Sequence, residues 1–290
     1  MSLKTYWEKI YQGRDAKPMA ELAAVCCPQA PHVYNRMFDA FQRRTVLRLL
    51  DVVRPLYGKV ILDLGCGFGR WTRLLRAQGV SVIGVDHALV PLVRNRVLDL
   101  RAPFAQMKLP DLCVRDQSVD GVVSVTVLQH LPHIEQRLTI RELQRCVRPG
   151  GFVLLLEHTG GHEGTNGDLL ATTFPNPPSR WIEMFVHHGF SLLESRPCLV
   201  LPIFRVYWRV RATLRRYLWV RPATMVKRGT PDVPTVQGVY GRLNFLAYAL
   251  LTPPSYLLER LIEAVPHLKD WMSQRLPVPQ RGFLFRREGK

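Results

Sequence analysis

LDLGCGFGRW (Leu62–Trp71) joins a short apolar run to the start of a helical pattern. Within it, Gly65, Gly67 and Gly69 stand at alternate positions. Glycine tolerates a positive φ and lets the backbone approach a ligand closely. The first turn of the helix that follows also carries free N–H groups. The stretch therefore predicts a ligand-binding turn between a strand and a helix.

The spacing of these glycines favours one class of ligand over another. A dinucleotide-binding turn reads GxGxxG and receives a pyrophosphate, whereas this turn reads GxGxG and follows Asp63. A carboxylate at that place can face the α-ammonium of an amino-acid-like ligand. Asp86 ends the next apolar run, where a carboxylate can accept both hydroxyls of a ribose. The expected ligand thus combines an amino acid with a ribose.

Short apolar runs alternate with helical patterns along most of the chain. Runs rich in Val, Ile and Leu are typical of buried parallel strands, and their alternation with helices favours right-handed βαβ units. We expect an α/β fold with a doubly wound, mostly parallel sheet that binds ligands at the carboxyl ends of its strands. The expected strands are Val60–Leu64, Ser81–Val85, Gly121–Val125, Phe152–Leu156, Phe190–Glu194 and Gly282–Arg286, with helices over Leu89–Arg101, Ile134–Val147 and Trp181–His188.

With these motifs in order, the sequence resembles the class I S-adenosylmethionine-dependent methyltransferases, in particular those that act on small molecules and glycoconjugates. Val119–Ser124, Leu128–Leu131 and Val147–Gly151 add to the likeness. The resemblance implies S-adenosylmethionine as cofactor, with its methionine part on the glycine turn, its ribose on the second aspartate and its adenine beside a histidine. The implied contacts are Asp63, Gly65, Cys66, Gly67, Gly69, Asp86 and His87.

One position departs from the family pattern. The family often has an acidic residue shortly before the Leu-Pro of the third loop, which here is Leu109-Pro110. Ala105 stands in that place, with Gln106 next to it. The resemblance places both residues at the adenine, where Gln106 offers an amide contact in place of the acid.

Three residues at strand ends are candidates for catalysis. Methyl transfer from a sulfonium depends mainly on positioning, but a hydroxyl acceptor also calls for a general base, for which histidine is well suited. His130 and His158 follow expected strands, and each is interpreted either as the base or as a packing or loop residue. Glu157 is a candidate to orient a histidine or to bind a substrate hydroxyl.

The basic charge of the chain is concentrated near its end. Of a net charge of +17, the larger part lies in residues 197–290, which hold sixteen basic and five acidic side chains. This asymmetry indicates an anionic partner, namely nucleic acid, acidic lipid or a phosphorylated substrate, or else a solvated basic surface. Phe204–Val220 forms a basic amphipathic pattern that suits a membrane interface, a phosphate backbone or a lid over the pocket.

The chain divides into three parts on these patterns. Residues 1–196 are expected to form the methyltransferase core with an N-terminal helical cap. Residues 197–280 are interpreted as a basic helical insertion with two apolar helices, Leu243–Leu251 and Ser255–Val265, the second begun by Pro253-Pro254. Residues 281–290 then complete the core as its final edge strand.

Other classes of protein are disfavoured. No run of about 18 apolar residues exists for a membrane span, Trp7 and Glu8 interrupt any signal-peptide core, and the six cysteines show no CxxC pair. We therefore expect no metal site and a cytoplasmic location, with peripheral membrane contact through 204–220. The leading hypothesis is O-methylation of a small-molecule or lipid-linked acceptor such as a sugar. An RNA methyltransferase and a non-catalytic partner protein with the same fold are the alternatives.

Overall fold

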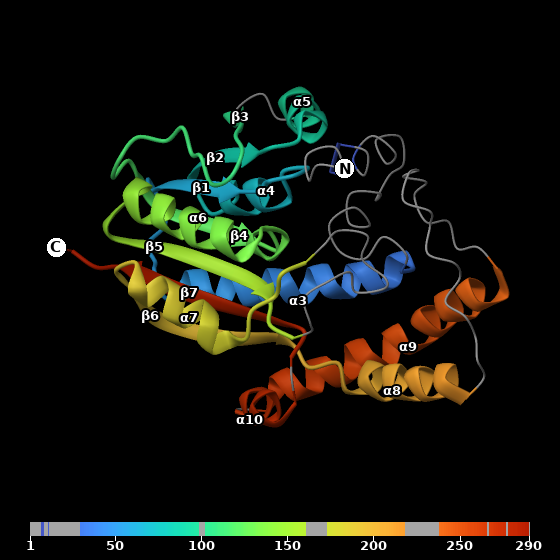
Figure 1. Ribbon diagram of the computed structural model, residues 1–290. Helices are drawn as coiled ribbons and strands as arrows, with labels where there is room; N and C mark the ends of the chain where they lie inside the picture. The colour runs from blue at the N-terminus through green and yellow to red at the C-terminus, as the bar shows by residue number, and fades with distance from the viewer. Residues whose placement is uncertain are drawn as a thin grey trace.

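A seven-stranded sheet forms the centre of the protein (Figure 1). The computed structural model describes residues 7–8, 11, 30–98, 102–160, 173–217, 238–265, 267–276 and 278–289. The strand order is β3-β2-β1-β4-β5-β7-β6, and β7 is antiparallel to both of its neighbours while the first five strands are parallel. The strands are β1 Val60–Leu64, β2 Ser81–Asp86, β3 Phe104–Gln106, β4 Val119–Val125, β5 Val147–His158, β6 Phe190–Leu199 and β7 Gln280–Arg287. The expected doubly wound α/β fold is confirmed.

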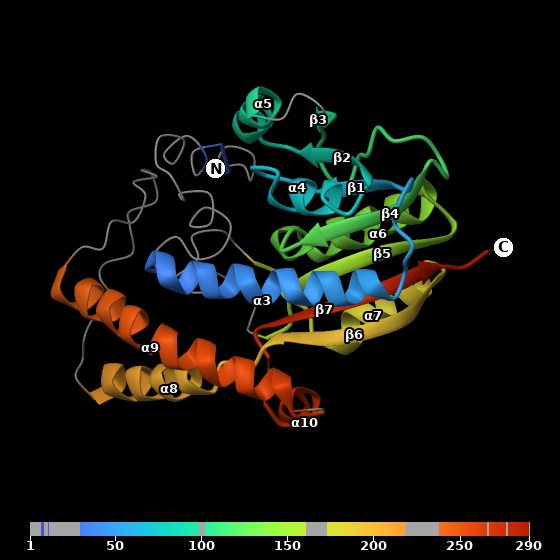
Figure 2. The same ribbon diagram turned by 180° about the vertical axis from the view of Figure 1, so that it is seen from behind.

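Helices cover both faces of the sheet. Figures 1 and 2 show α6 and α7 on one face and α3 on the other. The helices are α3 His32–Asp51, α4 Arg70–Arg76, α5 Leu89–Leu98, α6 His133–Cys146, α7 Pro178–His187, α8 Pro202–Tyr217, α9 Gly238–Ala264 and α10 Leu268–Arg275, with a 3₁₀ turn, η1, over Leu128–His130. Much of the expected N-terminal helical cap lies outside the described residues.

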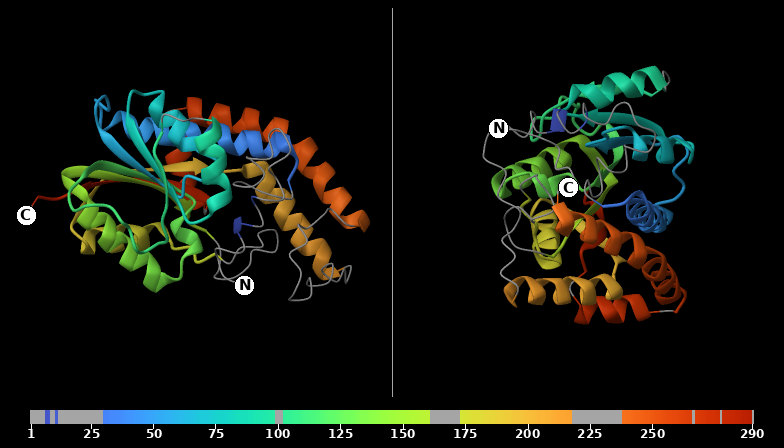
Figure 3. Two further views of the ribbon diagram at one scale, coloured as in Figure 1. Left: turned by 90° about the horizontal axis from the view of Figure 1, so that it is seen from above. Right: turned by 90° about the vertical axis from the view of Figure 1, so that its right-hand side faces the viewer.

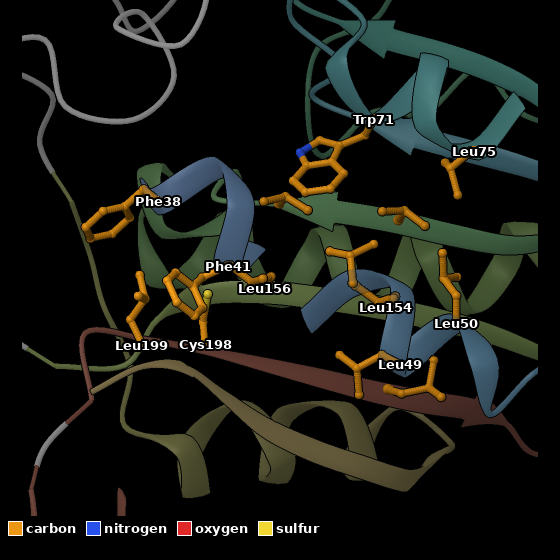
Figure 4. Close-up of a cluster of buried hydrophobic side chains, with 14 of the residues drawn as sticks. Phe38, Phe41, Leu49, Leu50, Trp71, Leu75, Leu154, Leu156, Cys198 and Leu199 are labelled. Carbon is orange, nitrogen blue, oxygen red and sulfur yellow. The ribbon is translucent and has the colours of Figure 1, made fainter. Parts of the chain in front are cut away.

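Alternate residues of the central strands pack into two separate hydrophobic cores, one on each face of the sheet. Val123 and Leu154 join the cluster beneath α3 and α4, whereas Val122 and Leu155 join the cluster beneath α6 and α7. This is the period-two alternation of a strand that is buried on both faces. Figure 4 shows the first cluster, in which Phe41 and Leu50 of α3 pack towards β5 and β6.

The last strand does not lie where we expected it. Residues 281–290 were predicted to form an edge strand, but β7 pairs with β5 on one side and with β6 on the other, so β6 is the edge. Phe283 and Phe285 are fully buried, one face of β7 being covered by α7. On the other face Gly282 lies so close to α3 that an added Cβ would stand 2.7 Å from Leu49 Cδ1. An interior strand therefore suits this apolar segment better than an edge.

The described part of the expected insertion contains the long helices α8 and α9, which extend beyond the carboxyl ends of the parallel strands, and the short helix α10, which lies near β6 (Figures 1 and 3). Phe204 of α8 and Tyr248 of α9 both pack on Tyr34 of α3, at ring-centroid distances of 5.0 and 4.8 Å. Trp208 Nε1 donates to the Tyr248 hydroxyl at 3.0 Å. The insertion thus shares the hydrophobic cluster of α3.

Pro253 and Pro254 do not begin a helix, contrary to the prediction of two separate helices. They lie inside α9, which runs unbroken from Gly238 to Ala264. Both prolines are exposed, so water can satisfy the carbonyls that lose their N–H donors. Glu259 in the same helix accepts the backbone N–H groups of Val200 and Leu201, which ties α9 to the turn after β6. Among the described residues, none of the helices combines the length and the apolar character that crossing a membrane requires.

Candidate functional site

The glycine turn between β1 and α4 has the positive-φ backbone that its glycines permit. Gly65, Gly67 and Gly69 adopt φ values of +69°, +48° and +70°. A Cβ at Gly65 would also stand 2.4 Å from Val127 Cγ2, so no other residue fits there. The N–H groups of Gly65 and Cys66 both donate to the Val85 carbonyl, at 2.8 and 2.9 Å, and thereby fasten the turn to β2.

Asp63 lies buried at the end of β1, next to this turn. Its carboxylate accepts the Thr72 hydroxyl at 2.6 Å. Burial raises the pKa of Asp63 to about 7, and the nearby charge of Asp86 acts in the same direction. A cation placed beside Asp63 would stabilise its ionised form, so the site suits a ligand with an ammonium group.

Asp86 braces the turn against the loop that follows β2. One carboxylate oxygen accepts the Gly67 N–H and the other accepts the Ala88 N–H, both at 2.9 Å. Each oxygen keeps a second lone pair, so the contact with ribose hydroxyls stays open to it. Burial raises the pKa of Asp86.

The expected adenine contacts lie together at the ends of β2 and β3. Gln106 donates its amide N–H to the His87 carbonyl at 2.8 Å, so this side chain joins the two strand ends. The ring nitrogen Nε2 of His87 is buried and has no hydrogen-bond partner among the described residues. Ala105 is half-buried beside them. The Cys66 thiol packs near Leu92 and Phe104, and burial raises its pKa, so it stays protonated.

Glu157 faces the protein interior. Its carboxylate accepts the N–H groups of Val127, Leu128 and Gln129, at 3.0, 2.9 and 3.3 Å. Burial raises the pKa of Glu157 to about 8, while the three donors oppose that shift. With its side chain fully buried, Glu157 holds the turn after β4 in place and is shielded from an acceptor. Of its two expected roles, orienting the segment that carries His130 agrees better with this position than binding a substrate hydroxyl.

Both candidate histidines lie at the carboxyl edge of the sheet, each against a glutamine. His158, the last residue of β5, has Nε2 3.1 Å from the amide nitrogen of Gln280, the first residue of β7. His130 in η1 has Nε2 3.3 Å from the amide nitrogen of Gln129, and its ring also meets Trp7 edge-on at 5.1 Å. Gln129 Oε1 in turn accepts the N–H of His158 at 2.9 Å, which links the two segments.

Three glutamines of this site were not predicted from the sequence. Gln42, Gln129 and Gln280 are all buried and come from α3, η1 and β7. The positions of Gln129 beside His130 and of Gln280 at a strand start were the signals available. Gln42 gave no signal, because only the tertiary fold brings α3 to this edge. Most of the polar loop that follows Thr159, which we expected to border the acceptor pocket, lies outside the described residues.

The arrangement fits S-adenosylmethionine. The three glycines of the turn bring its backbone to the end of β1 with no side chain in the way. Asp63 is a buried carboxylate suited to an ammonium, and the buried His87 Nε2 has no hydrogen-bond partner among the described residues. When bound, this cofactor supplies a methyl group that is already activated on a sulfonium.

Comparisons with known proteins agree with the site. Residues 61–151 match the family model of a methyltransferase domain. The tRNA U34 carboxymethyltransferase of Methylococcus capsulatus is 33% identical over 168 residues, 52% of this chain and 51% of that protein. The tRNA (carboxymethyluridine(34)-5-O)-methyltransferase of Arabidopsis thaliana is 31% identical over 168 residues, 58% of this chain and 39% of that protein. A solved complex of the Haloferax volcanii Trm112 methyltransferase activator with a methyltransferase shares the fold, with a TM-score of 0.56, 16% identity and coverage of 100% of both chains.

Residues 61–151 therefore form a methyltransferase domain, as the resemblance to the class I S-adenosylmethionine-dependent methyltransferases implies, and S-adenosylmethionine is the cofactor that its site fits. Both relatives carry the names of enzymes. The chain spans about half the length, or less, of these curated relatives.

Proposed function

We propose that this protein transfers the methyl group of S-adenosylmethionine to an oxygen of a lipid-linked acceptor at a membrane surface. The observation that carries the proposal is an exposed row of leucines along α9. Its members are between 54% and 74% exposed and follow one another at helical spacing, so they share one side of the helix. The row consists of Leu243, Leu246, Leu250, Leu257 and Leu261.

A lipid surface accounts for this leucine row better than water or nucleic acid does. Large exposed apolar patches are typical of interaction sites, and phosphate or base edges offer little to leucine. On α8, Val206, Arg209 and Val210 are exposed as well. An apolar side with arginine near it is the composition that binds an anionic membrane interface. The insertion starts where β6 ends, at the same edge of the sheet as the glycine turn, so a membrane-bound acceptor would approach from the correct side.

Vesicle sedimentation tests the membrane part of the proposal. We expect the protein to sediment with vesicles of phosphatidylcholine and phosphatidylglycerol, and the double variant Leu246→Ser, Leu250→Ser to stay in solution. Leu138→Ser is the matched control, because Leu138 is 40% exposed on α6, outside the insertion. Binding that the double variant retains would argue against the leucine row as the contact.

An RNA acceptor is the second candidate, favoured by one relative that is named a tRNA carboxymethyltransferase and by another that is named a tRNA methyltransferase. The basic excess of residues 197–290 would serve this function too. An RNA complex held by phosphate contacts weakens steeply with salt. Methyl transfer from labelled S-adenosylmethionine into total tRNA, compared with transfer into a membrane lipid extract, separates the two acceptors: label in the tRNA alone would replace the first proposal by the second.

A further inference from the structure

A chain of hydrogen bonds leads from an ion pair to His158. It starts at Arg70, whose guanidinium donates to Asp39 Oδ1 at 2.8 Å and to Gln42 Oε1 at 2.9 Å. A guanidinium has donors only, so the Gln42 atom that faces it must be the amide oxygen. The amide nitrogen of Gln42 is thereby turned the other way, where it donates to Gln280 Oε1 at 2.9 Å. Arg70 thereby fixes the orientation of the side-chain amides of both Gln42 and Gln280.

The next bond determines which nitrogen of His158 carries the proton. Because Gln280 Oε1 accepts the hydrogen bond from Gln42, the amide nitrogen of Gln280 faces His158 Nε2 at 3.1 Å. An amide nitrogen donates and does not accept, so Nε2 must hold a lone pair, and the proton of the neutral ring lies on Nδ1. Within the described part of the chain, Nδ1 makes no hydrogen bond of its own.

We infer that Gln42 and Gln280 hold His158 neutral as the Nδ1–H tautomer, so that this ring is a hydrogen-bond donor and not the general base of the reaction. A base needs a free lone pair, and the one lone pair that this ring has is bound to Gln280. The N–H at Nδ1 can instead orient an acceptor molecule through one of its oxygens. That last role rests on the proposed function, whereas the tautomer does not.

Burial strengthens the arrangement. Gln42 and Gln280 are almost fully enclosed, so an amide that turned round would leave a buried donor facing a donor, a loss that water cannot repair. Burial also lowers the pKa of His158 to about 4, which keeps the ring neutral at ordinary pH. His130 shows the same pattern on a smaller scale: Gln129 Oε1 accepts the His158 N–H, which turns its amide nitrogen towards His130 Nε2.

Nitrogen NMR of the histidine rings tests the inference without any acceptor. In protein labelled with ¹⁵N-histidine, the signals of His158 are identified by their loss in His158→Asn. We expect wild-type protein at pH 7 to show a protonated Nδ1 and an unprotonated Nε2. In Gln280→Glu the carboxylate provides no donor, so we expect a proton to appear on Nε2. Gln274→Glu adds the same charge at an exposed position of α10 and should leave the ring signals unchanged.

A second variant covers the case in which Gln280→Glu fails to fold. Gln42→Leu removes the bond that fixes the direction of Gln280 but adds no charge, so we expect the single tautomer to give way to a mixture. A protonated Nε2 in wild-type protein would overturn the inference, and so would an unchanged tautomer in a folded Gln280→Glu or Gln42→Leu variant. None of these results depends on which acceptor the enzyme methylates, so a failure of the proposed function would leave them standing.

Discussion

Asp63 is the residue whose ionisation a bound cofactor should change most. The fold buries its carboxylate with a hydroxyl as its side-chain partner, and its pKa rises to about 7. An unbound protein therefore holds this group partly protonated near neutral pH. An ammonium beside it favours the ionised form, so cofactor binding should release protons at pH 7 and should strengthen as the pH rises through 7.

We predict that Asp63→Asn weakens cofactor binding without unfolding the protein. The amide oxygen of asparagine can still accept the Thr72 hydroxyl, but the charge that attracts the ammonium is lost. Loss of a charged hydrogen bond costs about 1.5–3 kcal/mol, which corresponds to a decrease in affinity of roughly 10-fold to 100-fold. Titration calorimetry with S-adenosylmethionine at pH 8 measures it. Asp111→Asn, at an exposed position, is the control; equal affinity in both variants would remove Asp63 from the cofactor site.

His158 makes a pH-dependent contribution to stability. Its pKa is lowered to about 4 in the folded protein, whereas an unfolded chain takes up the proton near pH 6.5. The unfolded state then binds more protons between these values, so this contribution is fully present above pH 6.5 and is lost as the pH falls towards 4. Asp63 and Glu157, whose pKa values are raised, act in the opposite direction. A comparison with a variant is therefore needed to isolate the histidine.

For His158→Asn we predict a smaller loss of stability on acidification than for wild type. The difference in slope should approach one proton, about 1.4 kcal/mol per pH unit. Urea denaturation at several pH values between 4 and 7 measures it. His187→Asn, at an exposed position of α7, serves as the control. Identical slopes for wild type and His158→Asn would mean that His158 titrates normally.

At the level of elements, the turn after β4 depends on β5. Glu157 accepts hydrogen bonds from three consecutive N–H groups of this turn. One of the three residues, Val127, packs against Gly65. The turn that carries His130 and the turn that carries the cofactor motif are thus locked together. A change in the first should be transmitted to the second through Val127.

We predict that above pH 8, where Glu157 is ionised, Glu157→Gln destabilises the protein by about 1–3 kcal/mol, because an amide nitrogen would face the N–H of Gln129 and leave a buried donor unpaired. Cofactor affinity should fall along with stability, since Gly65 rests against the same turn. Thermal melting with and without S-adenosylmethionine checks both effects. Glu183→Gln, at an exposed position on α7, should melt like wild type. A variant with normal stability would show that the three hydrogen bonds contribute little.

The sequence predicted those parts of the site that local geometry dictates. The glycine turn, Asp63 and Asp86 follow from the strand-to-helix spacing, and the parallel strands follow from their apolar runs. The pairing of Gln42 with Gln280 could not be predicted from local sequence, because the two residues are 238 positions apart in the chain. The place of β7 between β5 and β6 was also missed, because strand order depends on long-range pairing that local patterns do not encode.

At the scale of the whole molecule, the insertion and the sheet share one hydrophobic cluster. Tyr34 of α3 meets both Phe204 and Tyr248, and the same cluster continues to Trp71 and Leu154 in the centre of the fold. Separate domains would each bury a core of their own. The packing of α8 and α9 is therefore expected to melt together with the sheet, as a single cooperative unit.

Tyr248→Ala tests this cooperativity. Truncation of a buried aromatic side chain costs about 3–5 kcal/mol, and here it also removes the partner of Trp208 Nε1. We predict that calorimetry shows one unfolding transition in wild type, and that the variant shifts this whole transition to lower temperature. Trp271→Ala, which removes a larger ring that is 53% exposed on α10, should shift it much less. If Tyr248→Ala instead gave two transitions, an early one and a late one at the wild-type temperature, the insertion would be an independent domain. The insertion could then be replaced without loss of the cofactor site.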